Sequence, residues 1–376
     1  MTQIIARFSG PLDDFDLDSE FSIPAKGVTA LFGQSGCGKT SVLRCLAGLS
    51  RQPGGFLSVK GQVWQDETSF LPTHQRPVGV VFQEASLFSH LSVKDNLVFG
   101  QKRAGARGQL LRLEDIVALL GLGDLLGRSP LTLSGGERQR VAIGRALLCG
   151  PELVLMDEPL AALDRFSKDE IIPYLETLFR KLDIPMIFVS HDTDEVERLA
   201  DWMVLMEKGR VLSSGPLGDV LSDPELFIAR GAKTASVVEG QVVGFDPEDL
   251  LSEMSVTGGK ILVPGRLGEV GTRHRIRISA NDVSLARERP SRTTILNVLP
   301  VRILAIHSLD EARVNVLISA GHGSSVADDG EPRARFIARI TRRSLRAFAF
   351  EVGQDIYAQV KSVSMLNPKK KIKKVS

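Results

Sequence analysis

Short buried strands separated by helices are the main pattern of the first part of the chain. Alternating or nearly alternating apolar positions predict strands at Ile4–Phe8 and Phe15–Ile23. Apolar residues at helical spacing from Val42 to Leu49 predict a helix. Buried strands that alternate with helices predict an α/β fold built on a parallel sheet. The nearly continuous apolar runs that predict such buried strands are Val28–Phe32, Val78–Phe82, Leu153–Met156 and Met186–Val189.

The rest of the chain follows two other patterns. Between Glu84 and Gly150 apolar residues recur at helical spacing, which predicts a helical insert in the sheet domain. The most regular face of this insert consists of Leu110, Leu113, Ile116, Val117, Leu119 and Leu120. After about Arg230 helical patterns nearly vanish, which predicts a separate all-β domain. Its expected strands are Arg275–Ser279, Val298–Ile306, Arg313–Ile318 and Phe348–Val352.

A short pattern occurs twice in the β-rich part. Glu269-Val270-Gly271 leads into an alternating run and the polar cluster Ser279-Ala280-Asn281. Glu351-Val352-Gly353 leads in the same way to Lys361-Ser362. The repetition indicates two related β units.

A glycine-rich loop connects the first buried strand to the helix after it. Gly33-Gln34-Ser35-Gly36-Cys37-Gly38-Lys39-Thr40 matches the phosphate-binding pattern G-x-x-x-x-G-K-[ST] completely. The glycines let backbone N–H groups face a phosphate, and the helix dipole adds positive potential there. Lys39 is expected to neutralise the β and γ phosphates, and Thr40 to offer its hydroxyl to Mg²⁺. Together with Ser41, this segment predicts a nucleotide site.

Two carboxylates follow the apolar strand at Leu153–Met156. Ligands bind at the carboxyl ends of strands in open parallel sheets, so Asp157 is expected to hold Mg²⁺. Glu158 is expected to point the other way, because strand side chains alternate, and to polarise a water for attack on the γ-phosphate. A strand that merely ends in solvated acids is the alternative, and the glycine loop favours the functional interpretation.

A second glycine pair begins another helix. Ser134 precedes Gly135 and Gly136, with Glu137 three positions on, and this arrangement by itself is a capping box. A hydroxyl, exposed amides and a helix dipole also form a phosphate-binding surface. One nucleotide does not need two such loops from one chain. We therefore expect a dimer in which the second loop of each chain closes over the nucleotide of the other.

Composition narrows the class of protein. The 376 residues are 43% hydrophobic and 24% charged, no apolar run approaches the length of a membrane span, and we expect a cytoplasmic location. Cys37, Cys45 and Cys149 are too few for a disulfide framework and are expected to be reduced thiols. The net charge of +2 includes the lysines of a basic tail, Lys369–Lys374, so the body of the chain is not that of a nucleic-acid binder.

These motifs together resemble those of ABC-transporter ATPase subunits. The resemblance covers about residues 1–231 and implies a P-loop ATPase domain with a RecA-like parallel sheet and a helical subdomain at about 84–150. Besides the glycine loop, it rests on Val81-Phe82-Gln83-Glu84, Leu133-Ser134-Gly135-Gly136-Glu137-Arg138-Gln139-Arg140, Leu153-Val154-Leu155-Met156-Asp157-Glu158-Pro159, Ala162-Leu163-Asp164 and Val189-Ser190-His191-Asp192.

The resemblance implies a role for each matching residue. Gln83 would contact Mg²⁺ and the attacking water, Glu158 would be the catalytic base, and His191 would contact the γ-phosphate. Ser134, Gly135 and Gly136 would bind ATP across the dimer, and Asp164 would communicate between the two chains. Such ATPases also place an aromatic residue for adenine before the glycine loop. Phe8 and Phe15 are the nearest aromatic residues, and neither falls clearly at that place.

The last part of the chain resembles the OB-like, molybdate-binding β-barrel domain of molybdate importer ATPases. The implied domains are a β-rich connecting or regulatory segment at 232–291, the barrel at 292–364 and the basic tail at 365–376. The resemblance rests on Thr293–Pro300, Ala338–Ser344 and Val360–Ser364. Hydroxyl, amide and ammonium donors suit a tetrahedral dianion. The candidate oxyanion donors are Thr294, Asn297, Lys361 and Ser362. A structural barrel without a ligand is the alternative, and Ile295-Leu296 departs from the usual small-residue-plus-Arg form of the first motif.

The resemblance therefore implies an ATP-hydrolysing, Mg²⁺-dependent importer subunit for molybdate or tungstate. Its expected partners are a second copy of itself, membrane permease subunits and, through them, an external solute-binding protein. It would sit on the cytoplasmic face of the inner membrane, with the permease docked near Leu87, Phe88, Leu91 and Val93. The alternatives are an importer of sulfate, ferric iron or a sugar, a soluble ABC ATPase, or an oxyanion sensor.

Overall fold

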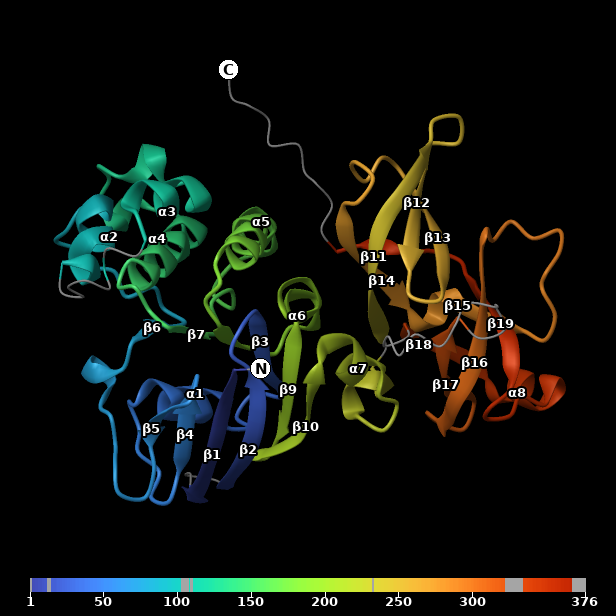
Figure 1. The fold of residues 1–376 in the computed structure, drawn as a ribbon, viewed down its shortest axis with the longest axis horizontal. Coiled ribbons are helices and arrows are strands. Elements are labelled where there is room, and N and C mark those ends of the chain that lie inside the picture. Colours follow the sequence, from blue (N-terminus) through green and yellow to red (C-terminus); the bar gives the residue numbers. More distant parts are fainter. Residues whose placement is uncertain are drawn as a thin grey trace. The chain divides into compact units, whose positions relative to one another are not determined.

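The structure is a computed structural model that describes residues 2–11, 15–102, 108, 111–231, 233–321 and 334–366. Leu110 of the expected helical face and the lysines of the basic tail lie outside the described residues. The chain divides into two compact units, Met1–Pro216 and Leu217–Ser376, which are described separately (Figure 1).

A mixed sheet of ten described strands forms the centre of the first unit. In spatial order the strands are β5 (Gln62–Gln65), β4 (Phe56–Val59), β1 (Gln3–Pro11), β2 (Asp16–Pro24), β10 (Arg210–Pro216), β9 (Trp202–Glu207), β3 (Val28–Gly33), β8 (Met186–Ser190), β7 (Leu153–Asp157) and β6 (Val78–Val81). The neighbours β9, β3, β8, β7 and β6 are parallel, whereas β2, β1, β4 and β5 pair antiparallel. The expected parallel sheet is thus the half of the sheet that carries the glycine loop.

Burial explains why these apolar runs become strands. Every residue of β3 and of β8 is buried, and β7 is buried up to its last residue. A strand covered on both faces needs apolar side chains at successive positions, whereas β2 alternates between exposed and buried residues. The carboxyl ends of β6, β7, β8 and β3 consequently meet along one edge of the sheet, where polar residues follow each strand.

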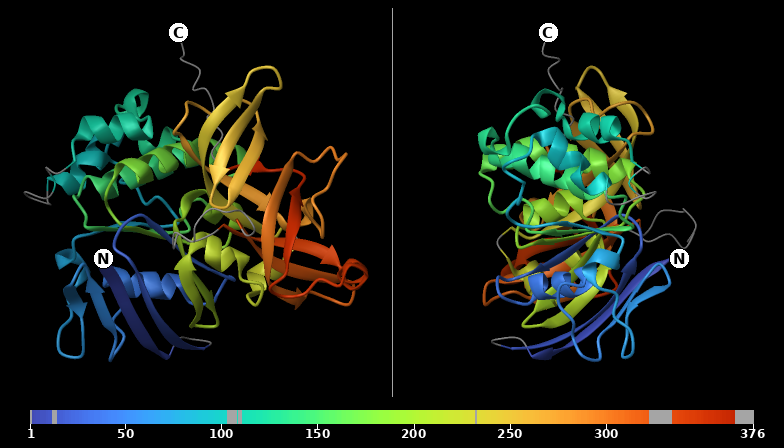
Figure 2. Two further views of the ribbon diagram at one scale, coloured as in Figure 1. Left: turned by 45° about the vertical axis from the view of Figure 1, so that its right-hand side comes forward. Right: turned by 90° about the vertical axis from the view of Figure 1, so that its left-hand side faces the viewer.

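Helices complete the first unit. The expected helical insert is confirmed by α2, α3 and α4, which gather together in both Figure 1 and Figure 2. Its helix α3 buries Ile116 and Leu120 at the predicted spacing. The described α-helices of this unit are α1 (Lys39–Ala47), α2 (Val93–Gln101), α3 (Leu113–Leu120), α4 (Gly135–Leu147), α5 (Arg165–Lys181) and α6 (Thr193–Leu199).

Two sheets, each with five strands among the described residues, share one hydrophobic core and form most of the second unit. The first sheet contains β13 (Gly259–Pro264), β12 (Leu251–Val256), β11 (Ala235–Asp246), β14 (Arg273–Ser279) and β20 (Ser364–Met365). The second contains β15 (Val283–Ala286), β19 (Asp355–Val360), β16 (Asn297–Ser308), β17 (Arg313–Ala320) and β18 (Arg335–Thr341). The described helices of this unit are α7 (Leu217–Ser222) and α8 (Arg342–Phe348).

The two sheets exchange strands where the sequence pattern repeats. After β14 the chain crosses to the second sheet, where β15 pairs with β19. After β19 it crosses back, and β20 pairs with β14. The glycines before β14 and β19, Gly271 and Gly353, both have left-handed backbone angles, with φ of 94° and 87°. The repeat therefore corresponds to two turn-strand-crossover segments, each of which completes the sheet of the other.

One predicted strand is wrong. Phe348–Val352 was expected to be β, but Phe348 ends α8, and Ala349 leaves the helix in a left-handed conformation with φ of 42°. Thr341 caps this helix by accepting a hydrogen bond from the Ser344 amide. The helix fully buries none of its seven residues and packs only Leu345 partly against the core, so a periodic apolar pattern is too short to reveal it.

Candidate nucleotide site

The glycine loop after β3 has the backbone conformation that its sequence requires. Gly36 and Gly38 have φ of 80° and 99°, in the left-handed region that other residues rarely adopt. A side chain at Gly33 would collide with the carbonyl oxygen of Met206. Gly38 is the N-cap of α1 and provides no side-chain cap, so the first amides of α1 face the loop without a side-chain acceptor. This arrangement suits a phosphate group.

Lys39 is packed inside this loop. Its Nζ donates to the carbonyl oxygens of Gly33 and Gln34, at 2.9 and 2.8 Å, and the residue is only 4% exposed. The Cys37 sulfur lies 3.9 Å from the same Nζ. Burial raises the pKa of the Cys37 thiol despite this cation, so the thiol is neutral at physiological pH. Lys39 therefore contributes the positive charge of the loop.

Thr40 and Asp157 form the first contact between the loop and the ends of the parallel strands. The Thr40 hydroxyl donates to Asp157 Oδ1 at 3.0 Å. Burial is the main reason why the pKa of Asp157 is raised, and the nearby charge of Glu158 adds to the rise. A cation bound to Asp157 would lower the pKa of Asp157 again, because the cation favours the ionised carboxylate.

Glu158 and His191 form the second contact. His191 Nδ1 lies 3.2 Å from Glu158 Oε1, and the imidazole is about half exposed. The expected reason for the orientation of Glu158 was wrong, because β7 already ends at Asp157. Glu158 instead turns through a left-handed conformation with φ of 41°. Strained backbone of this kind persists where the surrounding structure holds it, often at functional sites.

The segment after β6 carries Gln83, which is exposed at the same sheet edge. Arg145 of α4 holds the next residues in place by donating to the carbonyl oxygens of Ser86 and Ala85, at 3.0 and 3.3 Å. Ser86 has a φ of 43°, so this loop is also strained. The segment that follows Gln83 is therefore attached to the helix that begins after Ser134.

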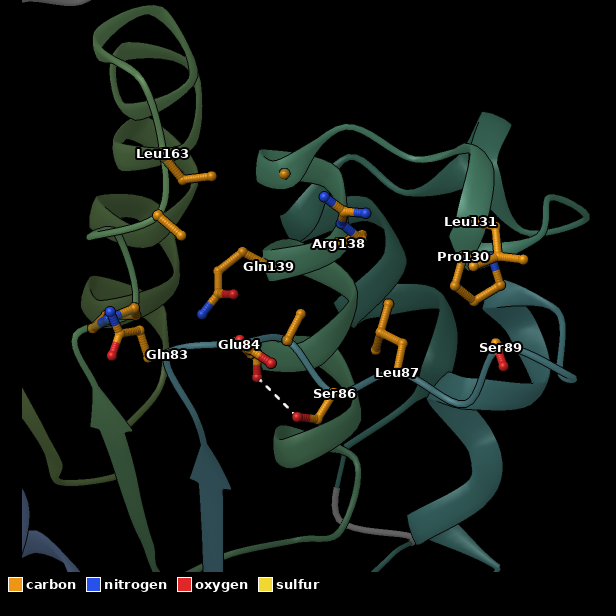
Figure 3. A pocket seen from close by; sticks show the side chains of 14 residues that line it. Gln83, Glu84, Ser86, Leu87, Ser89, Pro130, Leu131, Arg138, Gln139 and Leu163 are labelled. Atoms are coloured by element: carbon orange, nitrogen blue, oxygen red, sulfur yellow. Dashed lines mark hydrogen bonds between the residues drawn. The ribbon is translucent and has the colours of Figure 1, made fainter.

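A cavity of about 330 Å³ lies between this segment, the start of α4 and the loop after β7 (Figure 3). Figure 3 shows the Gln139 side chain pointing into the cavity, and Gln139 Nε2 has no hydrogen-bond partner among the described residues. Leu87 and Leu131 supply apolar surface, and Leu131 is 75% exposed. The expected docking residue Val93 does not belong here, since it is fully buried as the first residue of α2.

Ser134 and Glu137 form the expected capping box at the start of α4. Glu137 N donates to Ser134 Oγ at 3.2 Å, and Ser134 N donates to Glu137 Oε2 at 2.7 Å. The second of these bonds is the main reason why the pKa of Glu137 is lowered. Ser134 remains exposed. Its hydroxyl oxygen thus caps the helix, and the hydroxyl proton remains available to an acceptor.

Asp164 caps the start of α5. Its carboxylate accepts from the amides of Phe166 and Ser167 and from the Ser167 hydroxyl, at 2.8 to 3.1 Å. These bonds, led by that from the Ser167 amide, lower the pKa of Asp164. The preceding residue, Leu163, lies against Gly135. A Cβ atom added at Gly135 would be only 2.9 Å from the Leu163 side chain. The residue before Asp164 therefore packs against the first glycine of the pair.

Phe15 is a residue whose place the sequence left unresolved. A side chain at Gly38 would meet the Phe15 ring at 3.3 Å, so the ring lies against the glycine loop. The available signal was its alternation with Leu17, which places an aromatic side chain directly before the first residue of β2.

The candidate oxyanion residues of the second unit come together at one end of β16 and β19. Asn297 pairs with Val360, and Lys361 and Ser362 follow directly. Both amide atoms of Asn297 are already used, however, by the backbone of Leu262 at 2.7 and 3.0 Å. Asn297 therefore links two strands, and because its side chain is also buried it is a weaker oxyanion candidate than the exposed residues. Ser362 donates to Asp282, while Thr294 and the Lys361 side chain are exposed.

A tightly bound metal cluster is not present among the described residues, where no three His, Cys, Asp or Glu side chains come together as ligands. The pair Thr40 and Asp157 instead fits Mg²⁺, which proteins commonly hold through one or two side-chain oxygens together with nucleotide phosphates and waters. In the described ranges, no helix is both long enough and apolar enough to cross a bilayer.

Comparisons with known proteins match two families within the chain. The ABC transporter family model matches residues 17–161, and the TOBE domain model matches residues 293–366. The chain is 52% identical over 366 residues to the molybdenum import ATP-binding protein ModC of Rhodobacter capsulatus, covering 97% of this chain and 98% of the relative. The protein of the same name from Rhodopseudomonas palustris strain HaA2 is 50% identical, with 96% and 95% covered. That from Thiobacillus denitrificans is 49% identical, with 96% and 98% covered.

Proposed function

This chain belongs to the ABC transporter family, in the group of molybdenum import ATP-binding proteins, and from this premise we propose that it hydrolyses ATP to drive molybdate uptake through a membrane permease. The observation that carries the proposal is the pair of contacts at the strand ends, Thr40 with Asp157 and Glu158 with His191. They place a cation-binding pair and a base with its partner beside one phosphate loop.

The phosphate loop binds the nucleotide in this proposal. The amides at the start of α1 face the phosphates, and Lys39 exchanges its carbonyl partners for phosphate oxygens. Phe15 offers its ring to adenine at the adjoining end of β2. Mg²⁺, when bound, supplies charge neutralisation for the phosphates, and Thr40 and Asp157 would hold it together with Gln83.

Glu158 is the general base of the proposed reaction. Its carboxylate accepts a proton from the attacking water, and its contact with His191 fixes the orientation of Oε1. His191 is half exposed, and its other ring nitrogen would contact the γ-phosphate. Gln83, at the neighbouring strand end, orients the same water.

A second copy of the chain completes the site. The surface formed by Ser134, Gly135 and Leu163 contains a helix N-terminus with an exposed hydroxyl, which suits the γ-phosphate of a nucleotide held by the other chain. Asp164 follows Leu163 directly and would communicate between the two chains when the dimer closes. Nucleotide binding would then draw the two chains together, and hydrolysis would release them.

The cavity beside Gln83 is the proposed contact with the permease. It offers Leu87 and Leu131 as apolar surface, and the buried Gln139 Nε2 would have to become accessible to donate to a permease group. A permease segment in this cavity would touch the loop that Arg145 links to α4, and so would sense both Gln83 and Ser134. This arrangement would place the chain on the cytoplasmic face of the inner membrane.

The second unit is proposed to bind oxyanion through Thr294, Lys361 and Ser362, without Asn297. Hydroxyl donors and one ammonium group suit molybdate or tungstate. Ser362 must turn its hydroxyl away from Asp282 to do so, which lowers the expected affinity. Occupation of this site by cytoplasmic molybdate would provide feedback on ATP hydrolysis.

Replacing Glu158 by Gln tests the proposed function. The amide keeps the size of the carboxylate but cannot accept the proton, so kcat should fall by about 10² to 10⁴-fold while ATP binding remains. Steady-state phosphate release and binding of radiolabelled ATP by the full-length chain measure the two effects. Hydrolysis close to that of the unaltered chain would show that Glu158 is not the base.

A further inference from the structure

Lys168 joins α5 to the segment that carries His191. It lies on α5 four residues after Asp164, and its Nζ donates to Glu195 Oε1 at 2.7 Å and to Asp192 Oδ2 at 3.2 Å. The Glu195 side chain is only 6% exposed. Burial opposes the charge of Lys168, but the two carboxylates outweigh it and raise the pKa of the amine. The ion pairs are therefore fully formed at neutral pH.

The same residues close a ring of hydrogen bonds around the His191 backbone. Glu195 Oε2 accepts from the hydroxyl of the buried Ser190 at 2.7 Å. That hydroxyl oxygen in turn accepts from the Asp192 amide at 3.0 Å. Because Ser190 and Asp192 are the neighbours of His191 in the chain, the ring fixes the backbone on both sides of the imidazole.

A second ion pair already holds the two helices together. Arg198 of α6 donates to Glu176 of α5 at 2.9 and 3.0 Å, and its side chain is about as buried as that of Lys168. The Arg198 pair does not touch Ser190, His191 or Asp192 in the described contacts. The two pairs thus link the same helices, and only that of Lys168 contacts residues next to His191.

We propose that Lys168 is a positioning residue for ATP hydrolysis, which aligns His191 with Glu158 through Glu195 and Asp192 and ties this alignment to the start of α5. This inference rests on the proposed function. Without the ammonium group, two carboxylates would face each other with one of them buried, so Glu195 would turn away and release Ser190. The His191 backbone would then lose its fixed position relative to Glu158.

The start of α5 adds a consequence for the dimer. Asp164 caps this helix, and the Lys168 amide donates to the Asp164 carbonyl oxygen at 2.9 Å. A shift of the Asp164 segment on contact with a second chain would therefore move Lys168 and, through the ring, His191. Lys168 connects the surface expected to meet the partner with the residues expected to hydrolyse ATP.

The test replaces Lys168 by Met in the full-length chain, with Arg198→Met as the matched control. A shift of catalytic groups by about an ångström can cost up to about 10²-fold in rate. We expect K168M to lower kcat by about 10 to 100-fold with little change in KM for ATP. R198M should lose a similar amount of thermal stability and keep its kcat. K168R should recover most of the rate, because a guanidinium can bond both carboxylates.

Three outcomes would overturn the proposal. They are a K168M kcat equal to that of the unaltered chain, an equal loss of kcat in R198M, or failure of K168R to recover any rate. If K168M does not fold, Glu195→Gln replaces it, since the amide keeps the acceptor for Ser190 and removes the charge that Lys168 binds. An inactive E158Q together with an unaffected K168M would refute this inference alone, whereas an active E158Q would refute the proposed function.

Discussion

Polar side chains differ between the two units in whether they keep atoms available for a ligand. At the strand ends of the first unit, Asp157 and Glu158 each make one side-chain contact and keep further oxygen atoms for other ligands. In the second unit, Arg339 and Asn297 are buried and form hydrogen bonds with protein groups. A motif at the end of a parallel strand thus indicates a site, whereas a motif within a β barrel can indicate the fold alone.

Arg339 illustrates the second situation best. Its guanidinium donates to Asn315 Oδ1, to the carbonyl oxygens of Ala229 and Gly231, and to Thr234 Oγ1, at 2.9 to 3.0 Å. None of these partners is a carboxylate, and burial lowers the pKa of the arginine. Arg339 therefore fastens the segment that leads into β11 onto the second sheet.

Replacing Asp157 by Asn should give the largest effect and sharpen the contrast. Loss of a cation ligand should lower kcat at least about 100-fold, since metal assistance is worth several kcal/mol. The same change should raise the melting temperature without nucleotide at pH 7. Folding raises the pKa of Asp157, so its ionised form costs stability at pH values above that pKa, and Asn removes the cost.

Melting curves at several pH values check the sign. The stability advantage of D157N should shrink as the pH falls from 7 towards the pKa of an ordinary aspartate, because the folded protein then binds the proton that burial favours. Thr40→Val, which removes the hydroxyl that Asp157 binds, serves as a control that lowers hydrolysis without the gain in stability. A less stable D157N at neutral pH would contradict the argument.

Replacing Arg339 by Met should lower stability and leave ATP hydrolysis unchanged, which is the reverse of the effects expected for D157N. Several buried acceptors would lose their donor, which predicts a loss of about 2–4 kcal/mol in the second unit and no change in ATP hydrolysis by the folded chain. Both tryptophans, Trp64 and Trp202, lie in the first unit, so their fluorescence should report an unchanged unfolding transition. Hydrogen exchange of the amides in β17 and β18 should report the loss.

Arg335→Met is the control for this experiment. Arg335 lies on the same strand, but it is exposed. Its replacement should change the hydrogen exchange of the β17 and β18 amides no more than an ordinary surface substitution does. Equal protection in the two variants would mean that the hydrogen bonds of Arg339 contribute nothing measurable.

Asn297→Ala should give the smallest effect. Loss of its two hydrogen bonds to Leu262 predicts about 1–2 kcal/mol less stability for the second unit. Calorimetric titration with molybdate should then give an affinity similar to that of the unaltered chain. Thr294→Ala should instead keep the stability of the second unit and lower the molybdate affinity, since the residue is exposed and its hydroxyl is a proposed donor. A folded N297A chain that loses molybdate affinity would restore Asn297 as a ligand.

The sequence predicted the first unit well because its chemistry and its fold use the same residues. A buried strand needs a continuous apolar run, and a phosphate loop needs glycines, so β3, the glycine loop and α1 were all visible at once. The capping box at Ser134 was visible for the same reason, since it depends on residues three apart.

What the sequence could not predict depends on tertiary contacts. The left-handed turn at Glu158 has no residue signature, because glutamate rarely adopts this conformation. Lys168 lies 24 residues from Asp192, and a lysine near the start of a helix is ordinarily exposed. Asn297 binds Leu262 from a different sheet, so its motif could not distinguish a ligand from a link between strands.

The exchange of β15 and β20 between the sheets has a consequence for how the second unit acquires its structure. Pairing of Ile276 with Met365, and of Val283 with Val360, requires contacts that are distant along the chain. Neither repeat supplies the strand that pairs with its own sheet. A fragment with only one repeat would therefore expose unpaired strand edges, which promote aggregation. We expect this unit to form late and in a single cooperative step, and a cut between the repeats to yield two insoluble fragments that recover structure only when mixed.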